Sequence, residues 1–333
     1  MRYFEEEKNM FVKLDDEVVD ILCCPLCKGT LDVVAQKSVC KDCGTEYHKR
    51  GVVQGRRKEP VFDLRLHRPA YCIPPIVARW TDLQEEYKKY YRKGRSKDDL
   101  TVHLREIASV KEVYTEEFSI EGKVLDVGGG EGRLRHFLKE EDVPLYVSVD
   151  PYLEVFQNLE SQPNLLKAYP CLRTPCNFLS CHAENLPFNK NTFDWVHMRS
   201  VLDHFQDPYL ALKEVYRVLR SNGTLLIGLA VRSREPSLET DDNHDNPSRA
   251  VSLISKVRRK FAQRDLTSLA RSAVKRVMKE VKTRMSRSND HMFYWTYEDL
   301  IDLLHRSGFC VVKKHWQKPP LSMCIYLSAK KRS

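Results

Sequence analysis

Residues 123–132 read KVLDVGGGEG, and this stretch decides the fold of the chain. Its apolar run is followed by a loop that contains Gly128, Gly129, Gly130 and Gly132. Glycine lets the backbone turn sharply and leaves no side chain between the loop and a bound ligand. The next ten residues, RLRHFLKEED, favour a helix. The stretch therefore predicts a strand, a glycine loop and a helix, although an ordinary tight turn would also use glycines of this kind.

An acidic residue stands twenty positions past Gly130, where the run LYVSVD ends in Asp150. A carboxylate at the tip of a second strand can accept both hydroxyl hydrogens of an adenosine ribose. The nicotinamide-dinucleotide fingerprint would place its third glycine at position 133, which is Arg133 here. The spacing G-x-G-x-G therefore departs from the dinucleotide pattern.

Three further motifs follow in order: CHAENLPF (181–188), TFDWVHMRSVLDHF (192–205) and ALKEVYRVLRSNGTLLIGL (211–229). With these motifs the chain, from about residue 121 to its C-terminus, resembles the class I S-adenosylmethionine-dependent methyltransferases of the type 11 group. The resemblance implies S-adenosyl-L-methionine as methyl donor and a sheet whose last strand is antiparallel.

The resemblance also implies a donor site. Asp126 and the glycines would hold the methionine moiety, and Asp150 would take the ribose diol. The motif that usually ends Gly-Asp-Ala reads Cys-His-Ala here, so the neutral imidazole of His182 would replace the carboxylate that accepts from the adenine amino group. The residues so assigned are Asp126, Gly128, Gly129, Gly130, Asp150, Tyr152, His182, Ala183 and Met198.

The apolar pattern independently favours alternating strands and helices. Strands are predicted at 123–127, 145–149, 177–181, 193–198, 224–230, 309–316 and 323–329, and helices at 208–220 and 297–307. Such alternation indicates an α/β fold, a doubly wound, seven-stranded, mostly parallel sheet with helices on both faces. We expect it to follow a small zinc ribbon.

Two cysteine pairs predict that ribbon. Cys24-Pro-Leu-Cys27 and Cys40-Lys-Asp-Cys43 are separated by twelve residues, a spacing at which four thiolates converge on one tetrahedral metal. Zinc is the default ion, held structurally and closed to substrate. Cys23 is a competing ligand, and free thiols or a redox pair are the alternative to a metal site. This region resembles the zinc ribbons related to the activator subunit of tRNA methyltransferases.

The expected organisation is an N-terminal extension (1–19), the zinc ribbon (20–65), a helical linker (66–120) and the methyltransferase domain (121–333) with an insertion at 231–290. The linker is rich in charge and aromatic residues. Its tyrosines could stack on bases, but we favour a helix that packs on the sheet and forms one wall of the cofactor site.

The insertion contains a strongly basic part. Residues 249–287 carry thirteen lysines and arginines against two acidic residues, a net charge of +11, whereas the whole chain has +9. Apolar residues at helical spacing predict a basic amphipathic helix pair. It could cap the acceptor pocket, contact RNA phosphates or dock on an anionic membrane surface. We favour the cap, which would suit an anionic or nucleotide-linked acceptor.

Composition limits the cellular setting. No apolar run of the 333 residues approaches the roughly 20 residues of a membrane helix, and the charged N-terminus MRYFEEEKNM lacks the apolar segment of a signal peptide. Eleven cysteines without such a signal suggest reduced thiols and metal ligation. We expect a cytoplasmic protein without a transmembrane segment.

Methyl transfer from a sulfonium needs mainly alignment of donor and acceptor, with a base only where the acceptor loses a proton. The candidate bases are Asp203, His204 and His291. No asparagine-proline-proline-aromatic tetrapeptide follows the fourth strand, which argues against methylation of exocyclic amino groups of nucleobases.

Three functions stay open at this point. The first is O- or N-directed methylation of a small, glycan or lipid-linked acceptor. The second is methylation of rRNA or tRNA through the ribbon and the basic insertion. The third is an inactive methyltransferase-fold scaffold, which the intact Asp126, Gly128, Gly130 and Asp150 disfavour.

Overall fold

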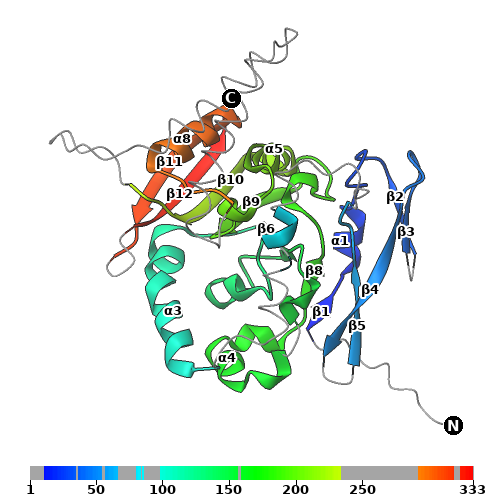
Figure 1. Cartoon of the computed structure of the whole chain (residues 1–333), viewed down its shortest axis with the longest axis horizontal. Helices are drawn as coiled ribbons and strands as arrows, with labels where there is room; N and C mark the ends of the chain where they lie inside the picture. Colours follow the sequence, from blue (N-terminus) through cyan, green and yellow to red (C-terminus); the bar gives the residue numbers. More distant parts are fainter. Residues whose placement is uncertain are drawn as a thin grey trace, which may run out of the picture.

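The computed structural model describes residues 11–34, 37–54, 57–66, 80–83, 85, 98–156, 159–233, 292–318 and 323–332. This portion of the chain forms one sheet of eight strands and a second sheet of four (Figure 1). The basic stretch 249–287, on which the cap, RNA and membrane readings depend, lies outside the described residues. Within the described ranges, no helix is both long and apolar enough to cross a bilayer.

The large sheet has the strand order β1-β8-β7-β6-β9-β10-β12-β11. Among the pairings between its strands, those of β12 with β10 and with β11 are antiparallel, and the others are parallel. The doubly wound, mostly parallel fold is therefore confirmed. The strands are β1 (Val12–Lys13), β6 (Lys123–Val127), β7 (Leu145–Val149), β8 (Cys176–Leu179), β9 (Phe193–Arg199), β10 (Leu219–Ala230), β11 (Phe309–Trp316) and β12 (Cys324–Lys331).

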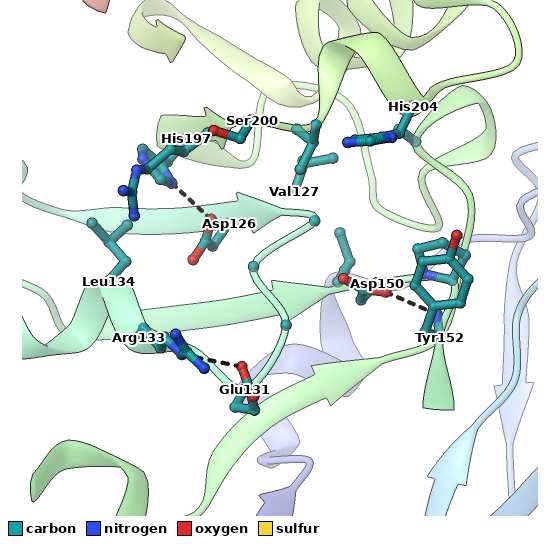
Figure 2. Close-up of a pocket in the computed structure, with 18 of the residues that line it drawn as sticks. Asp126, Val127, Glu131, Arg133, Leu134, Asp150, Tyr152, His197, Ser200 and His204 are labelled. Carbon is teal, nitrogen blue, oxygen red and sulfur yellow. Dashed lines mark hydrogen bonds and ion pairs between the residues drawn. The ribbon is translucent and has the colours of Figure 1, made fainter. Parts of the chain in front are cut away.

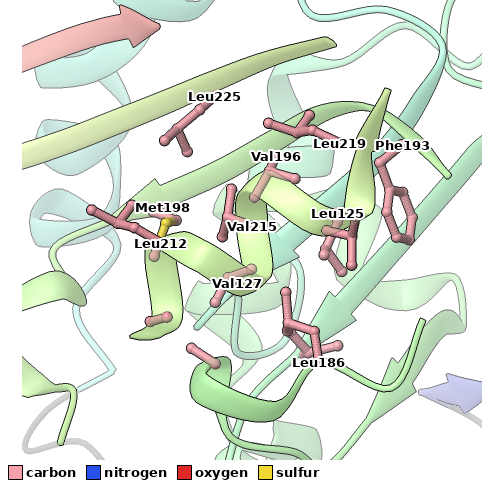
Figure 3. Packing of buried hydrophobic residues seen from close by; sticks show 14 of the residues in the cluster. Leu125, Val127, Leu186, Phe193, Val196, Met198, Leu212, Val215, Leu219 and Leu225 are labelled. Carbon is pink, nitrogen blue, oxygen red and sulfur yellow. The ribbon is translucent and has the colours of Figure 1, made fainter. Parts of the chain in front are cut away.

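Helices cover both faces of this sheet. Successive side chains of a strand point to opposite faces, so the apolar side chains on each face need a covering layer. Leu125 and Val127 of β6 face the core beneath α5 (Pro208–Val218) and α8 (Tyr297–Arg306) (Figure 3). On the opposite face, Val124 packs with α3 (Leu100–Glu112) and with the π-helical turn Val113–Glu117 that continues it. Two further short α-helices are α1 (Asp16–Asp20) and α4 (Pro163–Ala168).

Local sequence signals explain where α5 and α8 begin. Asp207 caps α5 by accepting from the backbone N–H of Leu210 at 3.1 Å, and a proline occupies the first turn. At the start of α8, Thr296 and Asp299 form a capping box, in which each side chain accepts from the other residue's backbone N–H.

The second sheet is the ribbon, with the order β2-β3-β4-β5. Its strands are β2 (Leu31–Val33), β3 (Lys37–Cys40), β4 (Glu46–Gln54) and β5 (Arg57–Phe62). Buried ribbon residues such as Tyr47 and Leu64 belong to the same hydrophobic cluster as Leu125 and Leu179 of the large sheet. The ribbon therefore packs against the β8 edge of the large sheet and shares its core (Figure 1).

Two local expectations from the sequence need correction. The large sheet has eight strands and not seven, because Val12–Lys13 pairs in parallel with β8. The segment after Gly132 is only a short 3-10 helix, Arg133–Phe137, in place of a ten-residue helix. Leu134 and Phe137, three positions apart, pack into one cluster, and Arg135 donates to the carbonyl of Thr174. These contacts anchor the segment after one and a half turns.

Candidate functional site

A cavity of about 310 Å³ opens at the carboxyl ends of the parallel strands. It lies where the strand order reverses, because the chain runs outward from β6 to β8 on one side and from β9 to β10 on the other. In open α/β sheets this switch point is where ligands bind. The glycine loop and the ends of β7, β8 and β9 form its walls (Figure 2). The linker residues Trp80, Glu106 and Tyr114 also line it.

Two glycines show why the loop has this sequence. Gly128 has a φ of +70°, and a Cβ atom there would lie 2.4 Å from a methyl carbon of Val201. Gly130 has a φ of +53°, but a Cβ atom there would have no heavy atom within 4 Å. Gly128 is required both by its left-handed backbone conformation and by the close approach of Val201. The second borders open space, which leaves room for a ligand directly against the loop.

Asp150 lies in the wall of this cavity and is almost fully buried (Figure 2). Its Oδ1 accepts from the backbone N–H of Tyr152 at 2.8 Å. Burial raises the pKa of this carboxyl to about 7, and the negative charges of Glu131 and Asp126 add to the rise, whereas the backbone donors oppose it. The carboxylate is therefore held where a ligand with two hydroxyl donors would favour its charged form.

Asp126 anchors a buried chain of hydrogen bonds on the cavity floor (Figure 2). The hydroxyl of Tyr146 donates to Asp126 Oδ2 at 2.5 Å, and His197 Nδ1 lies 2.7 Å from Asp126 Oδ1. On the other side of the imidazole, Nε2 lies 2.8 Å from the hydroxyl of Tyr114. With the proton on Nδ1, His197 donates to Asp126 and accepts from Tyr114. Asp126 thus borders the cavity while both its oxygens hold neighbouring side chains.

Charged side chains of both signs also line the cavity. Arg133 donates to Glu106 at 3.2 Å and forms an ion pair with Glu131 at 3.5 Å, and Arg199 also donates to Glu106, at 3.5 Å. The buried Nη2 of Arg133 has no hydrogen-bond partner among the residues that the structure describes. Amino-acid head groups carry one carboxylate and one ammonium, so Arg133 and Glu131 have the charges to receive them.

The residues expected near an adenine line the cavity as well. Tyr152, His182 and Ala183 all lie in its wall. The ring of Trp80 meets that of His182 edge-on at 5.2 Å, and its indole N–H donates to the carbonyl of His204 at 3.0 Å. Trp80, Glu106 and Tyr114 of the 66–120 segment therefore contribute to the cavity wall.

The expectation for Met198 is wrong. Met198 is buried in the core on the α5 face, where it packs among Leu212 and Val215 (Figure 3). Because β9 continues to Arg199, strand alternation turns His197 and Arg199 toward the cavity and Met198 away from it. The alternation of apolar and polar residues in VHMR was the sequence signal for this.

The candidate bases are only partly brought together. His204 lines the cavity, and its Nε2 lies 3.7 Å from Asp203 Oδ1. Asp203 is not among the lining residues, and its carbonyl accepts from the backbone N–H of Met292 at 2.9 Å. His291 lies outside the described residues.

The four cysteines predicted as metal ligands converge in the ribbon. Their sulfur atoms all lie within 4.8 Å of one another, with 3.8 Å between Cys24 and Cys43 and 3.4 Å between Cys27 and Cys40. Four thiolates at such distances suit one tetrahedral zinc. Cys23 is buried but does not belong to this group of converging sulfur atoms.

Family models match two parts of the chain. A methyltransferase-domain model matches residues 125–227, which hold the glycine loop, Asp150 and the strands around the cavity. The chain carries a methyltransferase domain. A Trm112p-like protein model matches residues 15–48, which contain all four metal-site cysteines. The methyltransferase domain is therefore preceded by a Trm112p-like domain whose cysteine cluster fits a structural zinc.

Curated relatives match this chain over limited stretches. It is 26% identical over 147 residues to the uncharacterised methyltransferase YcgJ of Bacillus subtilis, covering 43% of this chain and 54% of that protein. It is 37% identical over 111 residues to an uncharacterised methyltransferase of Schizosaccharomyces pombe, covering 30% and 37%. The chain thus spans about half, or less, of the length of these relatives.

Similar solved structures include two methyltransferase systems. A complex of the Haloferax volcanii Trm112 methyltransferase activator with a putative methyltransferase has a TM-score of 0.45 at 13% identity, covering 74% of this chain and 98% of that chain. The 1,6-didemethyltoxoflavin-N1-methyltransferase of Burkholderia thailandensis, bound to S-adenosylhomocysteine, has a TM-score of 0.44 at 15% identity, covering 90% and 100%.

Proposed function

We propose that the chain binds S-adenosyl-L-methionine in this cavity and transfers its methyl group to an oxygen or nitrogen of a small, glycan or lipid-linked acceptor. One observation carries the donor part: a buried carboxylate, Asp150, faces the open space beside Gly130 at the switch point of the sheet. That arrangement suits a ribose diol with the rest of the donor laid along the glycine loop.

The chain's own residues would hold the donor at both ends. Asp150 would accept from the two ribose hydroxyls, and His182 would lie beside the adenine. At the other end, Arg133 would donate to the methionine carboxylate and Glu131 would attract its ammonium. The sulfonium methyl is already activated when the donor binds, so orientation and exclusion of water are the main tasks left to the protein.

The described residues on either side of the insertion support its role as a cap over the acceptor. The chain enters the insertion after Ser233, whose carbonyl accepts from the backbone N–H of Tyr297 at 3.3 Å. It returns at Met292, whose N–H donates to the carbonyl of Asp203 beside the cavity residue His204. The described residue at which the chain returns from the insertion therefore contacts the immediate neighbour of a cavity-lining residue, which supports acceptor contact over a remote surface role.

Two groups could take a proton from the acceptor. His204 lines the cavity with Asp203 close to its imidazole. Alternatively, the hydroxyl of Tyr114 could receive the acceptor proton as it passes its own to His197, with the resulting imidazolium stabilised by Asp126. Burial raises the pKa of Tyr114 well above its usual range, so this route works by coupled transfer and not through a free phenolate.

The pH dependence of donor binding follows from Asp150. Its pKa is about 7 in the free protein, whereas the ribose hydroxyls bind the charged form. We expect affinity for S-adenosylhomocysteine to fall as pH drops from 8 to 6, approaching about tenfold per pH unit below 7. Calorimetry in buffers of different ionisation enthalpy should also detect proton release near pH 7. A flat profile, or the same profile in Asp150→Asn, would contradict the assignment.

The acceptor class is tested with labelled donor. Purified protein is incubated with S-adenosylmethionine carrying a labelled methyl group and with separated small-metabolite, lipid-linked glycan and RNA fractions of cells. We expect label in the first or second fraction. Ribonuclease-sensitive label in RNA would instead support the alternative function, in which 249–287 grips RNA phosphates and binding weakens steeply with salt. Absence of S-adenosylhomocysteine binding would overturn the donor part itself.

A further inference from the structure

The chain after the ribbon runs along the edge of the large sheet, next to the donor loop. Asp63 forms a parallel bridge with Ser180, which follows β8. The N–H of Ser180 donates to the carbonyl of Phe62 at 2.9 Å, and the N–H of Leu64 donates to the carbonyl of Ser180 at 2.7 Å. Residues 62–64 therefore extend the sheet beyond β8 at the level of the cavity.

Arg65 reaches from this edge into the donor loop. Its Nη1 donates to the carbonyl of Pro151 at 3.0 Å, and the hydroxyl of Ser180 donates to the same oxygen at 3.4 Å. The rest of the guanidinium donates to both carboxylate oxygens of Asp63, at 2.7 and 2.6 Å. Burial would raise the pKa of Asp63, but Arg65 outweighs this and holds it below its usual value. The pair therefore stays charged and fixes the direction of Nη1.

The carbonyl of Pro151 and the N–H of Tyr152 belong to the same planar peptide group. Arg65 and Ser180 hold its oxygen end, and its nitrogen end donates to Asp150 Oδ1 at 2.8 Å. Rotation of this plane would release both ends together. The peptide thus transmits the position of Arg65 to the carboxylate that borders the cavity.

We propose that Arg65 is a positioning residue that holds the Pro151–Tyr152 peptide, and through it the Asp150 carboxylate, in the geometry that binds the donor ribose. This inference rests on the proposed donor site. It adds that the segment leaving the Trm112p-like domain sets the shape of that site, although Arg65 is not among the residues that line the cavity. Free rotation of the peptide in its absence would let Asp150 lose its N–H donor and turn from the cavity.

Arg50 provides a matched control for the test. Its Nε lies 2.6 Å from Asp63 Oδ2, so it pairs with the same carboxylate. Its side chain is 56% exposed against 12% for Arg65, and its ion pair is with Asp63, whereas the donor to Pro151 is Arg65. Arg50→Gln removes one positive charge beside Asp63 and leaves the contact between Arg65 and the Pro151 carbonyl in place.

The experiment compares Arg65→Gln, Arg65→Lys and Arg50→Gln with the unaltered protein by calorimetric titration with S-adenosylhomocysteine from pH 6 to 8. We expect Arg65→Gln to weaken binding about tenfold, the scale of one lost charge-assisted hydrogen bond. The pH midpoint of binding should also move upward, because Asp150 loses the donor that favours its charged form. Arg65→Lys should recover part of the affinity, and Arg50→Gln should match the unaltered protein.

Ser180→Ala, which removes the second donor to Pro151, should shift affinity in the same direction by a smaller factor and keeps the test valid if Arg65→Gln does not fold. Unchanged affinity and an unchanged pH midpoint in Arg65→Gln, or equal losses in Arg65→Gln and Arg50→Gln, would overturn the proposal. If the unaltered protein fails to bind S-adenosylhomocysteine, the proposed function fails first, and the two results are distinguishable.

Discussion

Replacing Asp150 with alanine is expected to weaken binding of S-adenosylhomocysteine by about a hundredfold or more. The carboxylate would accept from both ribose hydroxyls, and each hydrogen bond to a charged group contributes about 1.5–3 kcal/mol. Its burial makes the loss large, because water replaces such contacts poorly in a closed site. Calorimetry on the two proteins at pH 8, where the carboxyl is ionised, measures the difference.

A suitable control is Asp302→Ala, which removes a carboxylate of α8 whose side chain is 66% exposed. It changes the net charge by the same amount and should leave donor affinity unaltered. If Asp150→Ala binds as tightly as the control, Asp150 is not the ribose anchor. If both variants lose affinity equally, the effect comes from overall charge and not from the site.

Replacing Cys40 with serine is expected to release zinc and to destabilise far more than the ribbon. Structural zinc sites contribute about 10–16 kcal/mol in isolated zinc-finger peptides, and a ribbon without the ion loses its fold. The sequence alone suggests that residues 20–50 would unfold by themselves. Ribbon residues Cys24, Tyr47 and Phe62, however, share one core with Leu179 and Phe188 of the methyltransferase domain. Loss of zinc should therefore lower the melting temperature of the whole protein.

Elemental analysis and thermal unfolding monitored by circular dichroism test this expectation. The unaltered protein should contain one zinc per chain and Cys40→Ser none. Cys310→Ser is the control, because Cys310 is exposed on β11 and lies outside the cysteine cluster. A full zinc content in Cys40→Ser would refute the ligand set, and a normal melting temperature without zinc would refute the shared core.

The sequence predicted the strands next to the glycine loop because their signals are local. Apolar runs bounded by charged or glycine residues mark β6 and β7, and the structure has both at 123–127 and 145–149 as expected. The ten-residue helix after Gly132 failed for a non-local reason: contacts of Arg135 with Thr174, far along the chain, end it early. The strand Val12–Lys13 was missed because two residues carry no periodicity.

The candidate site was predictable where a motif supplies its own geometry. The glycines, Asp150 and the cysteine pairs all belong to such motifs. The Tyr114–His197–Asp126 chain instead joins three residues from separate elements, and only the fold brings their side chains into contact. Arg65 is similar, because a contact with Pro151 has no signature in either local sequence.

The pairing of β1 with β8 has a consequence for biosynthesis. Asp15, just after β1, donates its backbone N–H to the side chain of Asn177, a residue 162 positions later. A contact between such distant residues forms late, because the long intervening chain must first be ordered. On the ribosome this segment emerges well before β8, yet it is among the last to reach its place in the fold. The four cysteines of the metal cluster lie within residues 24–43, so they close only a short loop and can bind the ion early. The ribbon can therefore fold before the edge of the large sheet has formed.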